Sequence, residues 1–136
     1  MKPIFVDTSA LIVIGNKNDD FHKQAVIIQK KLLQTNNRFL ITNAIVLELL
    51  NSFSQSKYKP IAIQLIKLIN DSKQWHCSPI DKYIPKGIEM FQKRLDKDWS
   101  LVDCISIIVA KNYNVTDIFT TDHHFEQAGF TILLKN

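Results

Sequence analysis

Five short apolar runs, separated by longer segments, organise the hydrophobic pattern of the chain. The runs are rich in β-branched and aromatic residues. Most of them lack the polar alternation of a half-exposed strand, so they are typical of strands buried on both faces of a sheet. We predict strands at residues 3–6, 38–42, 75–78, 117–120 and 130–134.

The longer segments between these runs have the periodicity of helices. In residues 19–34, for example, Phe21, Ala25 and Ile28 recur on one helical face. We place Asn43 and Asp81 as N-caps of two helices, because both residue types accept hydrogen bonds from free backbone amides. The predicted helices cover about 10–14, 19–34, 44–53, 59–70, the segment after 81, 100–111 and a short segment ending at 129.

Strands that alternate with helices predict a parallel sheet whose two faces are covered by helices. We therefore predict an α/β fold, a three-layer α/β/α sandwich with a central, mainly parallel sheet of four to five strands. The length of 136 residues suits one domain spanning residues 1–136. In open sheets of this kind, ligands bind beyond the carboxyl ends of the strands, so functional residues are expected directly after each strand.

The net charge of +4, from 17 basic and 13 acidic residues, favours a polyanionic partner such as nucleic acid. The basic residues are scattered along the chain rather than grouped. Only Arg38 and Arg94 are arginines, and lysines contact phosphate as point charges rather than as planar forks. Nucleic-acid binding is then expected to depend on backbone phosphates more than on base edges.

The two cysteines and the apolar segments bear on the compartment. Cys77 and Cys104 lack the spacing of a metal motif and have apolar neighbours, so we predict two buried free thiols in a reducing environment. No stretch approaches the roughly 18 apolar residues of a membrane span, and Asp7 interrupts the apolar start too early for a signal peptide. These features predict a cytoplasmic protein without membrane contacts.

Two aspartates stand directly after predicted strands. Asp7 follows the strand at 3–6, and Asp122 follows the strand at 117–120. Each could be a helix N-cap, a role that contributes about 1 kcal/mol. Thr8 and Ser9 could cap the first helix equally well, so that helix does not require Asp7. Both aspartates are therefore open to a structural and a catalytic interpretation.

Two further carboxylates lie in strongly apolar helical segments. Glu48 is the one charge of residues 44–50, and burying an unpaired carboxylate costs several kcal/mol unless a cation or a donor compensates. Its alternative is a wet stripe of the helix near Asn51 and Ser52. Asp103 follows Ser100 with the spacing of a capping box, although that motif normally uses Glu or Gln. The helix after it is apolar, so Asp103 is expected to point from the first turn toward the sheet edge.

A doubly wound sheet can bring these four carboxylates to one crevice. Crowded carboxylates repel one another unless a cation holds them. Oxygen ligands without paired thiols favour Mg²⁺ or Mn²⁺ over zinc, and these ions promote phosphodiester hydrolysis by activating bound water and stabilising the leaving oxygen. We therefore predict a catalytic, metal-binding site formed by Asp7, Glu48, Asp103 and Asp122.

Polar neighbours of the four carboxylates are candidates for supporting roles. Ser9 and Thr121 are placed to hydrogen-bond a carboxylate or a water molecule. Either His123 or His124 could serve as a metal ligand or a general acid. Adjacent histidines on one helix cannot both face the same ion.

The sequence around these residues resembles the PIN-domain ribonuclease family. The resemblance lies in an opening motif at 5–11 (FVDTSAL) and in closing motifs at 98–104 (DWSLVDC) and 120–130 (TTDHHFEQAGF). With Glu48 it covers essentially the whole chain, and the length fits compact bacterial toxin-like members of the VapC type. The resemblance implies the same four acidic residues as the site, an RNA substrate, a cognate antitoxin protein and a homodimer.

Together these inferences predict a Mg²⁺- or Mn²⁺-dependent endoribonuclease that cleaves single-stranded RNA, as the toxin of a type II toxin–antitoxin pair. The alternative is a non-catalytic α/β signalling or protein-binding module with an acidic Mg²⁺-binding pocket. A phospho-acceptor receiver domain, one such module, would need paired acids after the first strand and a lysine after a later one. Here Asp7 stands alone, and residues 120–122 (TTD) occupy the place of the lysine.

Overall fold

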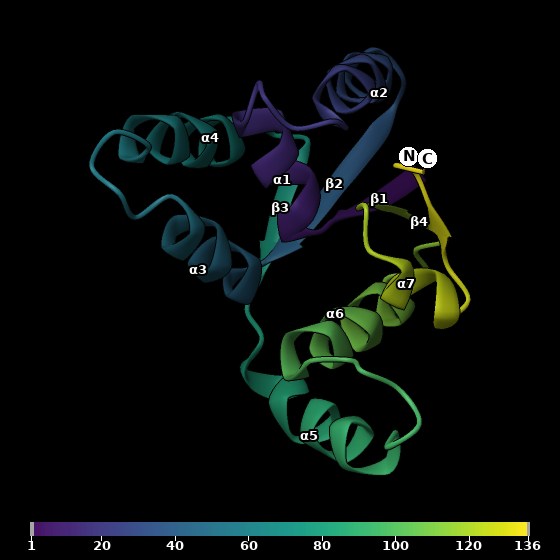
Figure 1. Ribbon diagram of the computed structural model, residues 1–136. Helices are drawn as coiled ribbons and strands as arrows, with labels where there is room; N and C mark the ends of the chain where they lie inside the picture. Colours follow the sequence, from purple (N-terminus) through teal and green to yellow (C-terminus); the bar gives the residue numbers. More distant parts are fainter. Residues whose placement is uncertain (1, 136) are drawn as a thin grey trace.

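The computed structural model describes residues 2–135 and has at its centre a sheet in which neighbouring strands are parallel. The strand order is β3-β2-β1-β4-β5 (Figure 1). The predicted parallel α/β fold is therefore confirmed. The strands are β1 (Lys2–Val6), β2 (Asn37–Thr42), β3 (Trp75–Ser78), β4 (Asp117–Phe119) and β5 (Thr131–Ile132).

A short, buried apolar run forms the central strand, β1. Phe5 pairs with Leu40 of β2 on one side and with Ile118 of β4 on the other. Phe5 and Val6 are fully buried, as expected for a strand that helices cover on both faces. Because β1 is central, the residue that follows it lies in the middle of the carboxyl edge of the sheet.

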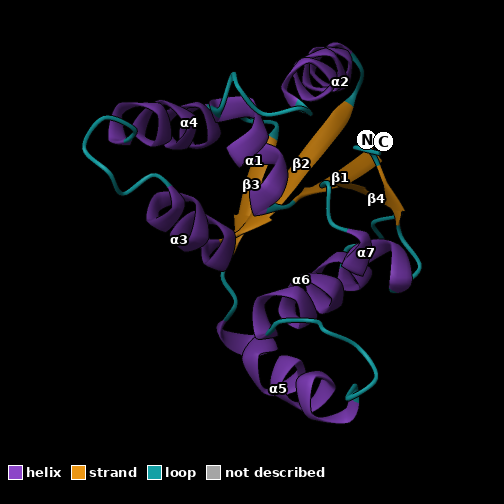
Figure 2. Cartoon of the chain, in the orientation of Figure 1, coloured by secondary structure: helices purple, strands orange, loops and turns teal. Residues whose placement is uncertain are grey.

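Helices cover the sheet in two groups, which completes the predicted three layers (Figure 2). The helices α1, α2, α3 and α4 pack on one face, and α6 and α7 on the other, with α5 outside α6. Their bounds are α1 (Thr8–Gly15), α2 (His22–Gln34), α3 (Asn43–Ser52), α4 (Lys59–Asp71), α5 (Ile84–Lys93), α6 (Leu101–Asn112) and α7 (His123–Gln127), and a short 3₁₀ turn (Asp81–Tyr83) precedes α5.

The inner position of α6 and the outer position of α5 follow from their side chains. Cys104, Ile105 and Ile107 of α6 are buried, so this helix is surrounded by protein, as its apolar sequence predicts. Gly87 of α5 faces Ile105 so closely that a Cβ atom at position 87 would lie 2.5 Å from the Ile105 Cγ1 atom. The missing side chain of Gly87 thus lets α5 pack tightly on α6.

Two predicted N-caps are wrong, and both errors are local. Thr42 caps α3, with its hydroxyl accepting a hydrogen bond from the Ile45 amide, while Asn43 is the first helical residue and accepts from the Ile80 amide. Asp81 makes no side-chain cap, because the 3₁₀ turn intervenes and α5 begins after Tyr83. In each case a neighbouring residue or turn competes for the helix start.

The last strand and one cysteine also differ from expectation. The strand predicted at 130–134 forms a ladder only over Thr131–Ile132. Cys104 is a buried free thiol as predicted, but Cys77 is exposed because it lies on the edge strand β3. Among residues 2–135, no helix is long and apolar enough to cross a membrane.

Candidate active site at the carboxyl edge of the sheet

The parallel pairing of β1 and β4 places Asp7 beside the end of β4. The Asp7 amide donates a hydrogen bond to the Phe119 carbonyl at 3.0 Å, extending the ladder by one residue. Asp7 holds the N-cap position of α1 in an extended conformation, but its carboxylate makes no capping hydrogen bond. The structural interpretation of this side chain is therefore wrong, and the carboxylate is free for another role.

Two hydroxyl groups hold the buried carboxylate of Asp7. Its Oδ2 atom accepts hydrogen bonds from the Thr120 hydroxyl at 2.9 Å and the Ser9 hydroxyl at 3.1 Å. These two hydroxyl oxygens lie 2.9 Å apart, so the three side chains form one compact network. Ser9 thus makes the hydrogen bond predicted for it.

The raised pKa of Asp7 shows that the surrounding protein destabilises its charged form. Asp7 is only 7% exposed, and burial raises the pKa of its carboxyl group from 3.8 to about 6. The hydrogen bonds from Thr120 and Ser9 lower the pKa, whereas the nearby charge of Asp103 raises it further. The effect of burial on the pKa is larger than that of the hydrogen bonds, so the site contains a carboxylate that a cation would stabilise.

The second carboxylate, Asp103, is fixed by the start of α6. Ser100 and Asp103 form a reciprocal capping box: the Ser100 hydroxyl accepts from the Asp103 amide at 3.0 Å, and the Asp103 Oδ2 atom accepts from the Ser100 amide at 3.1 Å. The predicted box is confirmed. It also aims the carboxylate into the site, because the same Oδ2 atom lies 2.9 Å from the His124 Nδ1 atom.

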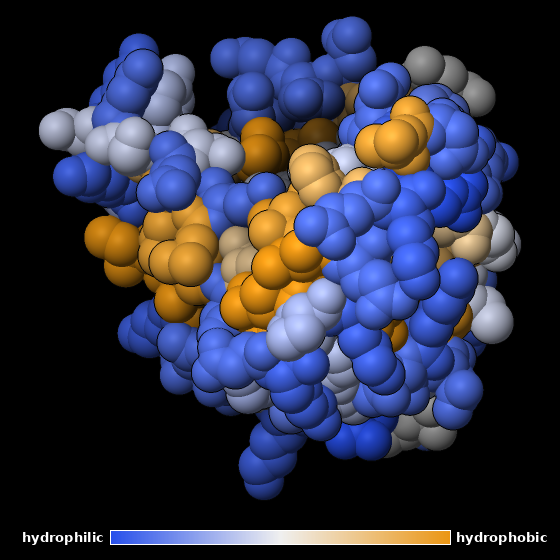
Figure 3. All heavy atoms as spheres, turned by 90° about the horizontal axis from the view of Figure 1, so that it is seen from below, coloured by the Kyte–Doolittle hydropathy of each residue, from blue (hydrophilic) through white to orange (hydrophobic). Residues whose placement is uncertain are grey.

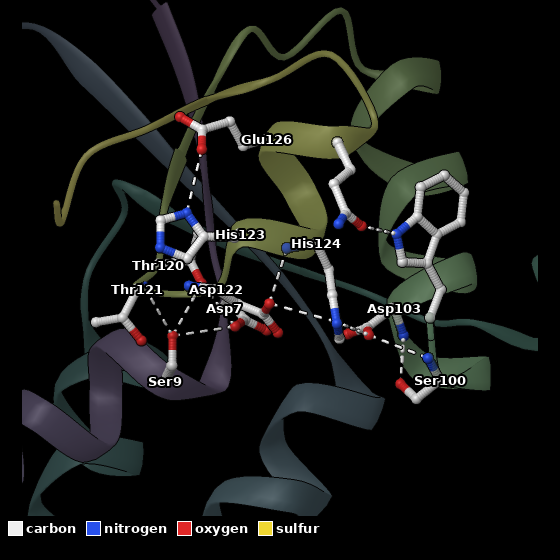
Figure 4. Close-up of polar contacts among 12 residues, drawn as sticks. Asp7, Ser9, Ser100, Asp103, Thr120, Thr121, Asp122, His123, His124 and Glu126 are labelled. Carbon is white, nitrogen blue, oxygen red and sulfur yellow. Dashed lines mark hydrogen bonds and ion pairs between the residues drawn. The ribbon is translucent and has the colours of Figure 1, made fainter. Parts of the chain in front are cut away.

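The third carboxylate, Asp122, is fixed by the start of α7. Its Oδ1 atom accepts a hydrogen bond from the His124 amide at 2.9 Å and lies 3.3 Å from the imidazole Nδ1 atom of the same residue. Asp103, Asp122 and His124 each offer a ligand atom within 4.8 Å of the others. Figure 4 shows Asp7 reaching toward this group from the end of β1.

Glu48 stands apart from this group. It is half-buried on α3, and its Oε1 atom accepts a hydrogen bond from the Thr8 hydroxyl at 2.7 Å. The hydroxyl of Thr8 supplies the donor that an apolar helix segment cannot, which explains how the fold accommodates the charge. Of the four predicted acids, Asp103 and Asp122 lie together, and Asp7 is close enough for the charge of Asp103 to raise its pKa. Glu48 is joined to the site through Thr8, the residue after Asp7.

The sequence does not mark Thr120 as a site residue, and His124 has a more central place in the site than the sequence predicts. Thr120 is fully buried and serves three partners: it donates to Asp7, contacts Ser9 and accepts from the Asp122 amide at 3.0 Å. Its signal in the sequence was a hydroxyl side chain at a buried strand end. Thr121, which was proposed instead, contributes its backbone amide to the Ser9 hydroxyl at 3.1 Å.

The donor set of the site suits a divalent cation. Three aspartates converge, and within residues 2–135 their one ion-pairing partner is His124, which bridges Asp103 and Asp122; no lysine or arginine pairs with any of the three. Carboxylate oxygens are the ligands that Mg²⁺ and Mn²⁺ prefer, and an imidazole nitrogen is a common ligand of first-row transition metals. The residues therefore fit a metal ion on the chemistry of their donor atoms.

Comparisons with known proteins bear on the fold and the family. The structure is similar to VapC20 from Mycobacterium tuberculosis, a sarcin-ricin loop cleaving toxin, with a TM-score of 0.83, 19% identity and coverage of 94% of this chain and 96% of that one. Two further similar structures are VapBC2 from Rickettsia felis, with a TM-score of 0.64, 16% identity and 96% coverage of both chains, and FitAcB from Neisseria gonorrhoeae, with a TM-score of 0.66, 17% identity and 95% coverage of both.

These identities are low, and the likeness is one of fold. No curated protein matches the chain in sequence. The PIN domain family model, in contrast, matches residues 4–131, a span that contains every residue of the site. The protein therefore belongs to the PIN domain family.

Proposed function

We propose that the protein is a metal-dependent endoribonuclease that hydrolyses phosphodiester bonds of single-stranded RNA, as the toxin of a type II toxin–antitoxin pair. The observation that carries the proposal is the buried Asp7 carboxylate, which has no cationic partner within the described chain and faces Asp103 and Asp122. The fold likeness to a toxin that cleaves the sarcin-ricin loop supports RNA as the substrate.

Asp7, Asp103 and Asp122 would hold the metal ion, and Glu48 would complete the pocket through its hydrogen bond with Thr8. When bound, a Mg²⁺ or Mn²⁺ ion lowers the pKa of a water molecule and offsets charge on the phosphate. Thr120 and Ser9 keep the Asp7 carboxylate in one orientation, and the two helix caps do the same for Asp103 and Asp122. Residues held in this way need little rearrangement to bind an ion.

His124 keeps together the two carboxylates that cap α6 and α7. Its imidazole lies between Asp103 of α6 and Asp122 of α7, and its own amide is the donor that Asp122 caps. The side chain thereby links the starts of the two helices on either side of the cluster. It also adds a nitrogen donor beside the carboxylate oxygens.

The proposed partners are a cognate antitoxin and a second copy of the chain. The compact toxin-like members that the chain resembles support the antitoxin. The homodimer is supported by exposed apolar side chains on two helices, Leu47 and Leu50 of α3 and Ile88 and Phe91 of α5. Figure 3, a view from the α5 side, shows apolar side chains gathered on this face and bordered by hydrophilic ones.

The decisive experiment is cleavage of a fluorescent single-stranded RNA in the presence of Mg²⁺ or Mn²⁺. We expect Asp7→Asn and Asp103→Asn to reduce cleavage on the order of 100-fold or more, because even residues that only support metal ligands are worth 10- to 100-fold. Asp98→Asn is the matched control, since Asp98 is exposed and outside the cluster. A fully active Asp7→Asn protein would overturn the mechanism.

Calorimetric titration with Mn²⁺, combined with the cleavage assay, separates the nuclease from the non-catalytic alternative. A nuclease binds the ion through the aspartates and cleaves RNA, whereas a signalling or protein-binding module binds the ion and leaves RNA intact.

Induction of the wild-type and Asp7→Asn proteins in bacteria tests the toxin role, with growth arrest expected only for the wild type.

A further inference from the structure

Cations line a series of three hollows on the side of the molecule formed by α5, α6 and the open part of the sheet. The first hollow, of about 380 Å³, is lined by Lys86, Lys93 and Arg94. The second, of about 490 Å³, is lined by Lys82, Lys86 and Lys111. The third, of about 460 Å³, lies over β2 and β3 and is lined by Arg38.

The first two hollows share lining residues, and the third lies next to the second along the chain. Lys86 and Ile108 border both the first and the second. Asn112 lines the second, and the next residue, Tyr113, lines the third. We name the six cations of this series the basic track: Lys82, Lys86, Lys93, Arg94, Lys111 and Arg38.

Positive charge remains in excess along the basic track: within the described chain Lys93 pairs with Glu89 and Arg94 with Asp96, and the other four cations form no ion pair. Among the described residues that line the three hollows, Glu89 is the one acid, and Lys93 neutralises it at 2.7 Å. Both arginines of the chain belong to the track. A hollow on the α1 side of the site, lined by Asp19, Asp20 and Thr121, contains no cation among its lining residues. Of these two sides, the track side is therefore the one that attracts a polyanion.

The end of the track at Arg94 is connected to the site. The Arg94 guanidinium lies 4.8 Å from the centre of the Trp99 ring, and the Trp99 indole donates a hydrogen bond to the Gln127 side chain at 3.0 Å. Gln127 ends α7, the helix that Asp122 caps. Two side-chain contacts thus link the track to α7, the helix that Asp122 caps.

The spacing of the track suits a nucleic-acid backbone. Lys86 and Lys93 are seven positions apart on α5, which corresponds to roughly 10 Å along the helix, and Lys82 precedes them in the 3₁₀ turn. RNA presents one charge per nucleotide on a continuous backbone, and exposed lysines contact such charges without selecting a base. In the third hollow the His76 and Tyr113 rings lie 5.9 Å apart and offer aromatic faces on which unpaired bases stack.

We propose that the basic track binds the phosphate backbone of the single-stranded RNA on one side of the scissile bond. This inference rests on the proposed function and adds to it the direction in which the substrate leaves the site. The track lies across α5 and α6 and then on the open sheet face, so it serves only RNAs long enough to extend beyond the carboxylates.

Binding of a labelled single-stranded RNA of roughly 12 nucleotides, a length within the usual range of such sites, tests the proposal. The measurement is fluorescence anisotropy on intact Asp7→Asn protein between about 50 and about 200 mM KCl. The test variant carries Lys82→Gln, Lys86→Gln and Lys111→Gln. The control carries Lys23→Gln, Lys30→Gln and Lys67→Gln on α2 and α4, which are equally exposed and change the net charge by the same amount.

We expect the slope of log affinity against log salt to become less steep by about 2 in the test variant, at about 0.7 for each lost phosphate contact. The control should keep the slope of its parent. Equal losses in both variants, or no loss in the test variant, would overturn the track, and so would stronger competition by an acidic peptide than by unlabelled RNA. Thermal unfolding of both variants verifies that they are folded.

Cleavage assays on the same substitutions in the wild-type background keep the two proposals apart. If the wild-type protein cleaves RNA and the test variant cleaves it equally well at low substrate concentration, the proposal of the basic track is contradicted and that of the nuclease is not. A protein that binds RNA through the track but never cleaves it contradicts the nuclease and leaves the track standing.

Discussion

The three clustered aspartates differ in how their charge is used. Asp103 and Asp122 each accept a backbone amide at a helix start and also face His124, so capping and site membership are combined in one side chain. Asp7 makes no capping hydrogen bond, and the Thr120 and Ser9 hydroxyl groups are the main support of its charge. It is therefore the residue whose charge depends most on a bound cation.

We expect Asp7→Asn to stabilise the metal-free protein at neutral pH. Burial raises the pKa of Asp7 from 3.8 to about 6, so the folded protein binds this proton more tightly than the unfolded chain. The charged form then destabilises the fold above pH 6, and the penalty disappears as the pH falls below the unfolded value. The gain in the free energy of unfolding is at most about 3 kcal/mol near pH 7.5 and shrinks between pH 6 and pH 4.

Urea unfolding in a chelating buffer, from about pH 4 to about pH 7.5, measures this difference. Asp98→Asn, on an exposed side chain, should show no pH-dependent gain. An Asp7→Asn protein that is no more stable than the wild type near pH 7.5 contradicts the prediction.

At the scale of single residues, the sequence indicates the acidic site residues better than the hydroxyl side chains that hydrogen-bond them. Asp7, Asp103 and Asp122 stand out because they follow strands or open an apolar helix. Thr120 does not, since a threonine at a strand end is common and only the pairing of β1 with β4 brings it to Asp7. The contact of Glu48 with Thr8 is equally invisible, because it joins residues 40 positions apart.

The packing of α5 on α6 depends on Gly87. In Gly87→Ala the new methyl group would lie 2.5 Å from the Ile105 Cγ1 atom, and Ile105 is buried and cannot move freely. Overpacking of this kind costs about 1–3 kcal/mol, against a gain of about 1 kcal/mol from helix propensity. We expect a net loss of stability, measured as a lower melting temperature.

Gln92→Ala, on an exposed position of the same helix, is the matched control and should be neutral or slightly stabilising. A Gly87→Ala protein that melts at or above the wild-type temperature would show that α5 can shift away from α6 without cost.

Elements were easier to predict than their ends. The strands come from runs whose burial demands apolar residues on both faces, and β3 has the predicted bounds. The errors arise where two local solutions compete. Thr42 and Asn43 are both good caps, and the tertiary contact of Asn43 with Ile80 decides between them. β5 is shorter than its apolar run because the paired register ends at Ile132, although the Leu133 amide still donates to the Ile118 carbonyl at 3.0 Å.

For the whole molecule, we expect the exposed apolar side chains of α3 and α5 to mediate dimerisation. Leu47 is 63% exposed, and Phe91 also faces solvent. Burial of such surface between two copies stabilises a dimer by about 25 cal/mol for each Å² removed from water. Leu47→Lys combined with Phe91→Lys should therefore yield a monomer by light scattering coupled to size-exclusion chromatography.

Ile63→Lys on α4 is the matched control, because Ile63 is 62% exposed and lies outside the proposed interface. It should leave the dimer intact. A monomeric wild-type protein, or dissociation by Ile63→Lys alone, would contradict this interface.

The network around Asp7 also has a consequence for timing. Its hydrogen bond with Thr120 joins residues that are 113 positions apart, and the central strand β1 gains its β4 neighbour only after most of the chain is made. At about 5–20 residues per second, the interval between the two residues is roughly 6–23 s of synthesis. On the proposed function, a nascent chain still emerging from the ribosome has its first catalytic residue exposed but not yet assembled. It cannot cut RNA until β4 and α7 have docked.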